Sequence, residues 1–150
     1  MIIWNFQTIV AHSIGVHFAV QAAEELAKDG ISVEVINLRS IRPLDIDTIN
    51  ESIMKTNHLL TVEGISQKDV LLFFHLLHKT NTILGGWPQH GVGAEVAAQV
   101  MEGPAFHYLD APVIRCHGAD VPMPYAKSCE FNCTPQAEVV VRAVRKMLNR

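Results

Sequence analysis

The sequence predicts an α/β fold in which a mainly parallel β-sheet lies between two layers of helices, a three-layer, doubly wound sandwich. The first reason is that short runs rich in β-branched residues alternate with longer segments whose apolar residues recur every three or four positions. The second is that the strand candidate at residues 31–38 (ISVEVINL) is apolar on both faces, as expected when helices cover both sides. With 150 residues, 49% of them hydrophobic, the chain is long enough for one such domain.

The N-terminal part predicts a strand, a helix and a second strand. Residues 8–11 are a β-branched run that ends at a polar turn. Asp29 and Gly30 end the helix expected over residues 16–28, since glycine accepts the left-handed backbone found at many helix ends. Residues 31–38 follow as the second strand, which completes a βαβ unit. The predicted buried face of the helix comprises Val16, Ala19, Val20, Ala23, Leu26 and Ala27.

The same alternation continues along the rest of the chain. Asp45 is a suitable N-cap for a helix over residues 46–55. The buried face of that helix is expected to consist of Ile46, Ile49, Ile53 and Met54. The later elements are expected at residues 58–63 (strand), 92–101 (helix), 111–116 (strand) and 135–148 (helix).

Composition excludes several classes of function. A net charge of -3 provides no basic field, so no nucleic-acid partner is expected. The longest apolar run, residues 70–77, is too short to span a bilayer, so no membrane partner is expected either. Three cysteines without zinc-site spacing predict free thiols. His75 and His78 share a helical face but lack a carboxylate to complete a set, so no metal site is predicted.

Two long segments carry a resemblance to a known family. Residues 12–64, from HSIGVH to TVEG, and residues 86–126, from GWPQHG to PMPYA, closely resemble the C-terminal domain of pyruvate dehydrogenase beta subunits. That domain belongs to the transketolase C-terminal domain family. In the family V-E-G runs directly into G-W-P-Q, so residues 65–84 are expected to be an insertion in a single domain that spans residues 1–150.

The resemblance implies assembly and docking rather than chemistry. In the family, thiamine diphosphate and magnesium lie between the alpha subunit and the N-terminal domain of the beta subunit, and that domain is expected to be absent here. This chain alone is therefore expected to be inactive, with no catalytic, cofactor-binding or metal-binding residues of its own. The intact enzyme would oxidatively decarboxylate pyruvate and transfer the acetyl group to lipoamide in the mitochondrial matrix.

The implied partners are an alpha subunit, a second beta subunit in a heterotetramer, and the subunit-binding domain of dihydrolipoyl acetyltransferase. Asp110 matches an acidic position that the family uses for docking that domain, and the terminal carboxylate of Arg150 is a second candidate. Trp87 is a candidate subunit-interface anchor, because aromatic residues on loops often fill this role. From the residues alone, Asp110 could instead cap a turn, and Trp87 could belong to the core.

Two further functional hypotheses remain open at this stage: an anion-binding domain and a truncated product. Gly91 and Gly93 open a predicted helix, where a small nucleotide- or anion-binding domain would place a phosphate, although tight packing explains the same glycines. Glu63 ends a strand, where it could serve a function or form an ion pair with Arg39 or Arg42. The other hypothesis is a truncated product without independent function.

Overall fold

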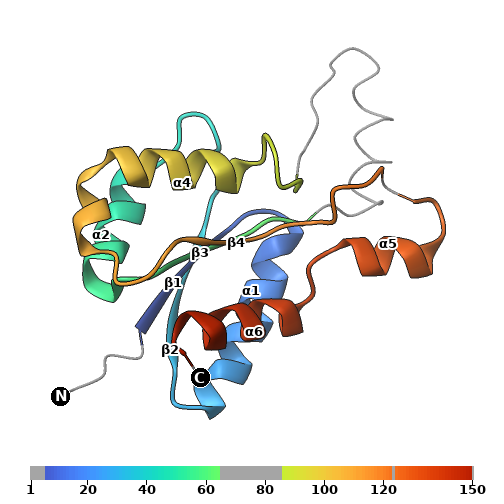
Figure 1. Ribbon diagram of the computed structural model, residues 1–150, viewed down its shortest axis with the longest axis horizontal. Helices are drawn as coiled ribbons and strands as arrows, with labels where there is room; N and C mark the ends of the chain where they lie inside the picture. The colour runs from blue at the N-terminus through green and yellow to red at the C-terminus, as the bar shows by residue number, and fades with distance from the viewer. Residues whose placement is uncertain (1–5, 65–85, 123, 150) are drawn as a thin grey trace.

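The computed structural model describes residues 6–64, 86–122 and 124–149 and shows one parallel sheet between two helical layers (Figure 1). The four strands lie in the order β2-β1-β3-β4, and each neighbouring pair is parallel. The strands are β1 (Phe6–Ala11), β2 (Ser32–Asn37), β3 (Leu59–Val62) and β4 (Ile114–Cys116). The predicted three-layer α/β sandwich is therefore confirmed.

Helices cover both faces of this sheet. They are α1 (Ile14–Lys28), α2 (Ile46–Thr56), α4 (Val92–Glu102), the 3-10 turn η1 (Pro104–Tyr108), α5 (Lys127–Cys133) and α6 (Ala137–Met147). Figure 1 shows α1 and α6 on one face, α2 and α4 on the other, and α5 to one side of the sandwich. Among the described residues, no helix is both long and apolar enough to cross a membrane.

Alternation along the central strands divides the core into two clusters. Leu60 and Val62 of β3 face α1 and α6, whereas the preceding Leu59 faces α2 and α4. All three side chains are fully buried, which is what a strand with two covered faces requires. Sheet burial on both sides explains why the strand candidates are apolar at successive positions.

The packing of α1 depends on small residues. A Cβ added at Gly15 would lie 2.7 Å from the backbone oxygen of Val62, so only glycine allows α1 to begin this close to β3. The buried positions that follow are Ala19, Ala22 and Leu26. The prediction placed Val20 and Ala27 on the buried face, and this was wrong: both are exposed, because the close approach at Gly15 sets the rotation of the helix.

Two predicted helix ends are confirmed by their hydrogen bonds or backbone. Asp45 caps α2 by accepting a hydrogen bond from the Thr48 backbone N–H at 3.2 Å. Gly30, just after α1, has a positive φ of 73°. On α2 the predicted stripe is buried at Ile49 and Ile53, but Met54 is 36% exposed and does not belong to it.

Two short elements were not predicted. Both η1 (PAFHY) and α5 (KSCEFNC) are too short to show helical periodicity. β4 is also shorter than expected, since it begins at Ile114 rather than residue 111.

Candidate functional site

A parallel sheet has two distinct ends, and the predicted functional residues divide between them. The amino end is where β3 and β4 begin, and the carboxyl end is where they finish. Loops at either end are exposed and free of sheet pairing, so binding residues are usually found there. Arg150 and residues 65–85, which include His75 and His78, lie outside the described residues.

Asp110 lies at the amino end of the sheet. Its backbone N–H donates to the carbonyl oxygen of Asn57 at 2.9 Å, and Asn57 precedes β3 by two residues. The Asp110 side chain is exposed and forms no hydrogen bond or ion pair with any described residue. The turn-capping role that the sequence allowed for its carboxylate is therefore not observed.

Aromatic side chains precede Asp110 on η1. Phe106 and Tyr108 are 42% and 47% exposed, whereas Ala105 is buried and Leu109 packs against the core between α2 and α4. The inward residues fix the turn while the aromatic residues remain at the surface. We call Phe106, Tyr108 and Asp110 the Asp110 surface.

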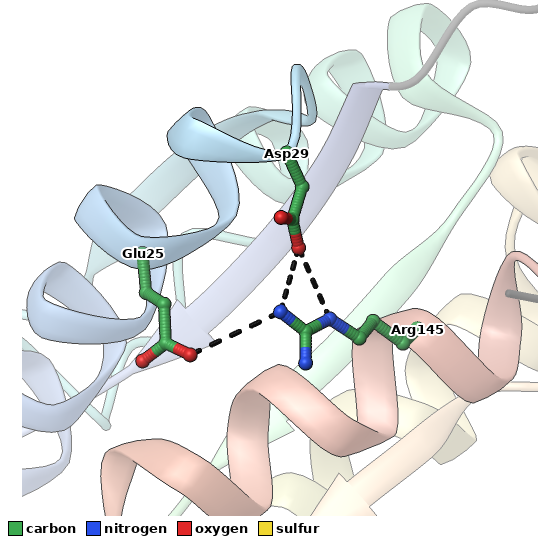
Figure 2. Close-up of polar contacts among 3 residues, drawn as sticks. All are labelled: Glu25, Asp29 and Arg145. Carbon is green, nitrogen blue, oxygen red and sulfur yellow. Dashed lines mark hydrogen bonds and ion pairs between the residues drawn. The ribbon is translucent and has the colours of Figure 1, made fainter.

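The last turn of α6 lies at the same end of the sheet. Figure 2 shows Arg145 of α6 reaching to Asp29 and Glu25 at the end of α1. Its Nη2 atom lies 2.6 Å from Asp29 Oδ2 and 3.9 Å from Glu25 Oε1. Since Asp29 immediately precedes the turn into β2, the described part of α6 ends at the amino end, as Asp110 does. Such an exposed ion pair stabilises the fold by only about 0.2–1 kcal/mol, so it serves mainly to align α6 with α1.

Trp87 lies at the opposite, carboxyl end. It belongs to the loop at residues 86–90, which is held by two hydrogen bonds: the Gly118 N–H donates to Gly86 O at 2.6 Å, and Arg115 Nη1 donates to Pro88 O at 2.8 Å. The Trp87 side chain is half-buried. The structure thus separates Trp87 from Asp110 instead of bringing them into one site.

The helix α5 is attached next to this loop. The Ala119 N–H donates to Cys133 O at 2.9 Å, directly after the residue that binds Gly86. None of the α5 residues is buried, and Phe131 is 60% exposed. Tyr125, just before the helix, is 90% exposed. We call Trp87, Tyr125 and Phe131 the Trp87–α5 surface.

Glu63 is the most deeply buried acidic residue described at the carboxyl end. It is 2% exposed, and its Oε1 atom accepts a hydrogen bond from the Gly93 N–H at the start of α4, at 2.7 Å. The ion pair that the sequence allowed with Arg39 or Arg42 is not observed, and both arginines are exposed.

The glycines at the start of α4 are explained by this carboxylate. A Cβ at Gly91 would lie 2.6 Å from Glu63 Oε2, and a Cβ at Gly93 would collide with Glu63 Oε1 and Thr61 Oγ1. The N-terminus of α4 therefore holds the carboxylate of the residue that follows β3, and this carboxylate occupies the position where a phosphate would sit. The tight-packing explanation of Gly91 and Gly93 is supported over the anion-binding one.

Burial shifts the acid–base properties of the groups at this end. It raises the pKa of Glu63, while the backbone N–H groups of Gly93 and Val92 and the charges of His117 and Arg115 act in the opposite direction. Burial also lowers the pKa of His12. The three cysteines are free thiols, as predicted, and burial raises the pKa of Cys116 to about 11.

The described residues on either side of the expected insertion lie close together. A Cβ added at Gly86 would lie 3.3 Å from the carbonyl carbon of Gly64 and 3.2 Å from that of Glu63. The backbone at Gly86 therefore lies directly beside that of Glu63 and Gly64.

The comparison with known protein families decides the assignment. The family described as "Transketolase, C-terminal domain" matches residues 7–68 and 69–140. The chain belongs to the transketolase C-terminal domain family. The resemblance on which the sequence-based expectations relied is therefore confirmed, as is the fold that it implied.

Within this family, similar relatives share one description. The chain is 54% identical over 142 residues to the bovine mitochondrial pyruvate dehydrogenase E1 component subunit beta, and 50% identical to the human protein of the same name. The Drosophila melanogaster protein is 51% identical over 141 residues. In the bovine and human comparisons 95% of this chain is aligned, but only 34% of the relative. The chain therefore spans about a third of the length of these relatives.

A solved structure supports the same placement in the transketolase C-terminal domain family. The chain is similar to a "Split gene transketolase, inactive beta4 tetramer", with a TM-score of 0.69 and 26% sequence identity. The match covers 97% of this chain and 39% of that one.

Proposed function

We propose that this domain serves assembly and docking in the beta subunit of a mitochondrial pyruvate dehydrogenase. The intact enzyme oxidatively decarboxylates pyruvate and transfers the acetyl group to lipoamide. The observation that carries the docking role is the Asp110 surface, where an exposed carboxylate without a described ionic partner follows two exposed aromatic residues.

The proposed ligand of the Asp110 surface is the basic subunit-binding domain of dihydrolipoyl acetyltransferase. An unpaired carboxylate attracts lysine and arginine side chains, and nearby exposed aromatic rings supply apolar contact area. The last turn of α6 lies at the same end of the sheet, which is consistent with a contribution from the terminal carboxylate of Arg150. Electrostatic steering of this kind weakens as salt is added.

We propose that the described residues hold neither thiamine diphosphate nor magnesium. Among them, no group of three histidine, cysteine or acidic side chains could hold a metal ion. The N-terminus of α4, the best diphosphate candidate in the sequence, is occupied by Glu63. The proposal therefore assigns this domain no catalytic step and leaves both cofactors to other parts of the intact enzyme.

The Asp110 variant tests docking directly. Asp110→Asn is expected to weaken binding of the acetyltransferase subunit-binding domain about 30-fold, equivalent to about 2 kcal/mol, and to reduce the salt dependence of the affinity. Isothermal titration calorimetry of the full chain at low and high salt measures both quantities. Asp120→Asn is the matched control, because Asp120 is exposed but follows β4 at the carboxyl end.

The outcomes separate the alternatives. Equal losses in both variants would indicate a general charge effect rather than a site at Asp110. No binding by the folded wild-type chain would favour the hypothesis of a truncated product without independent function.

We propose that the second surface, Trp87–α5, mediates assembly with another beta subunit, with an alpha subunit completing the heterotetramer. The helix α5 has seven residues and none of them is buried, so packing within this chain gives it little stability. A partner covering Tyr125 and Phe131 would supply that packing. The split-gene transketolase relative, whose beta chains form a tetramer, is consistent with contacts between beta subunits.

We propose that the domain does not need residues 65–85, which include the insertion expected at residues 65–84. Because Gly64 and Gly86 lie side by side, we expect that deleting residues 65–85 joins them with little change to the described contacts. The deleted chain is expected to be equally stable or up to about 2 kcal/mol more stable, since a long loop no longer has to be closed. Thermal unfolding and the docking titration measure the two effects.

A glycine–serine linker of equal length in place of residues 65–85 is the control for this deletion. If the linker chain folds but the deleted chain does not, the two glycines cannot be joined as proposed. If both chains lose docking affinity, residues 65–85 contribute to the docking surface.

A further inference from the structure

Glu63 has an incomplete set of hydrogen bonds in a buried position. Its Oε1 atom accepts from the Gly93 N–H, and the Val92 N–H also favours the ionised carboxylate, but Oε2 makes no hydrogen bond of good geometry with any described residue. A buried polar atom without a partner is costly, so such atoms are rare in folded proteins. The unpaired Oε2 atom of Glu63 therefore needs a physical explanation.

Glu63 Oε2 and the loop that carries Trp87 both lie next to Gly91. An added Cβ at Gly91 would lie 2.6 Å from Glu63 Oε2 and 2.8 Å from the carbonyl oxygen of Trp87. Both oxygens thus border the same small space beside Gly91. An ionised carboxylate repels a carbonyl oxygen there, whereas a protonated carboxyl group can donate a hydrogen bond to it.

Of the groups around this space, Glu63 is the one that we expect to gain and lose the proton. From β4 and the residue after it, Arg115 and His117 face the carboxylate, but neither forms an ion pair with it. His12 follows β1 and lines the same small pocket as Glu63, and burial favours its neutral form. Thr61 of β3 also lines that pocket, and its Oγ1 atom has no hydrogen-bond partner among the described residues.

We propose that Glu63 is a proton-responsive positioning residue for the loop at residues 86–90. When protonated, Glu63 donates from Oε2 to the carbonyl oxygen of Trp87 and holds the loop against the start of α4. When ionised, it releases that carbonyl group, and the loop is held only by Gly118 and Arg115. Any effect of this loop movement on subunit contacts rests on the proposed role of Trp87 in assembly. The movement of the loop itself does not depend on that role.

The direction of the pH dependence follows from burial. Because burial raises the pKa of Glu63 in the folded chain, folding favours its protonated form. The stability linked to this proton is fully present below the ordinary glutamate pKa and is lost as the pH rises through the raised one. The loop is therefore expected to be held at low pH and released as the pH increases.

Fluorescence of Trp87 tests the proposal without any partner. The sequence contains two tryptophans, so a Trp4→Phe background makes Trp87 the sole emitter. Its emission maximum is expected to shift in a single titration whose midpoint lies above the ordinary glutamate pKa of 4.5. In Glu63→Gln the shift is expected to vanish, with emission fixed at the low-pH position, because the amide donates a hydrogen bond at every pH.

Two results would overturn the proposal. The first is a titration that persists in Glu63→Gln, which would assign it to a group other than Glu63. The second is the absence of any shift between about pH 4 and pH 8 in the folded Trp4→Phe chain, the range over which a perturbed glutamate titrates. A merely structural role would change the melting temperature of Glu63→Gln but leave the titration in place. Docking at Asp110 is measured separately, so failure of one proposal leaves the other standing.

Discussion

Replacing Gly93 with valine is expected to destabilise the domain by about 3 kcal/mol or more. Its side chain would have to occupy the space of Glu63 Oε1 and Thr61 Oγ1, both of which belong to buried residues of the sheet. Displacing Glu63 would also break its hydrogen bond with the Gly93 N–H, so overpacking and the lost bond act together. Chemical denaturation followed by circular dichroism measures the change in the free energy of unfolding.

Ala98→Val provides the matched control for this prediction. Ala98 lies on the exposed face of the same helix, so valine there is expected to cost only its lower helix propensity, less than about 1 kcal/mol. Similar losses in the two variants would show that valine weakens α4 generally. The contact between Glu63 and the start of α4 would then not be the reason for glycine at position 93.

Charging the Trp87–α5 surface is expected to weaken self-association of the chain at least 100-fold. The double variant Tyr125→Asp/Phe131→Asp removes two exposed aromatic anchors, and central aromatic residues at interfaces contribute about 2–4 kcal/mol each. Since no α5 residue is buried within the chain, the fold should be unaffected. Sedimentation equilibrium over a range of concentrations measures association, and circular dichroism monitors the fold.

Val20→Asp is the control for the association experiment. Val20 is 43% exposed on α1, away from the Trp87–α5 surface, and its replacement should leave association unchanged. If the wild-type chain remains monomeric at every concentration, the Trp87–α5 surface is not sufficient by itself for contacts between beta subunits. Equal weakening by Val20→Asp would indicate a non-specific effect of added negative charge.

The helices and strands with strong apolar periodicity were predictable from the sequence. The strand at residues 31–38 and the helix over residues 46–55 agree with β2 and α2 to within a residue or two at each end. Asp45 and Gly30 were recognisable because capping and left-handed backbone depend on local chemistry. The elements η1 and α5 were missed because short turns and helices without a buried face carry no periodic pattern.

The candidate surfaces were only partly predictable. Asp110 and Trp87 were identified individually, but the residues that accompany them, Phe106 and Tyr108 in one case and Tyr125 and Phe131 in the other, were not. An exposed aromatic residue cannot be distinguished from a buried one by its type. The segment between Glu102 and Asp110, with its aromatic residues flanked by acids, was the signal in the sequence that could have directed attention to η1.

The sequence by itself determined the layered α/β fold and the family, because periodicity, capping residues and shared motifs are properties of local stretches of chain. Only the tertiary structure decided that Asp110 and Trp87 lie at opposite ends of the sheet, and that Glu63 pairs with the start of α4 rather than with Arg39 or Arg42. The physical reason is that parallel strand pairing fixes which distant loops become neighbours, and the close approach of α4 to β3 fixes which polar groups meet. Neither relationship can be predicted from residues that are adjacent along the chain.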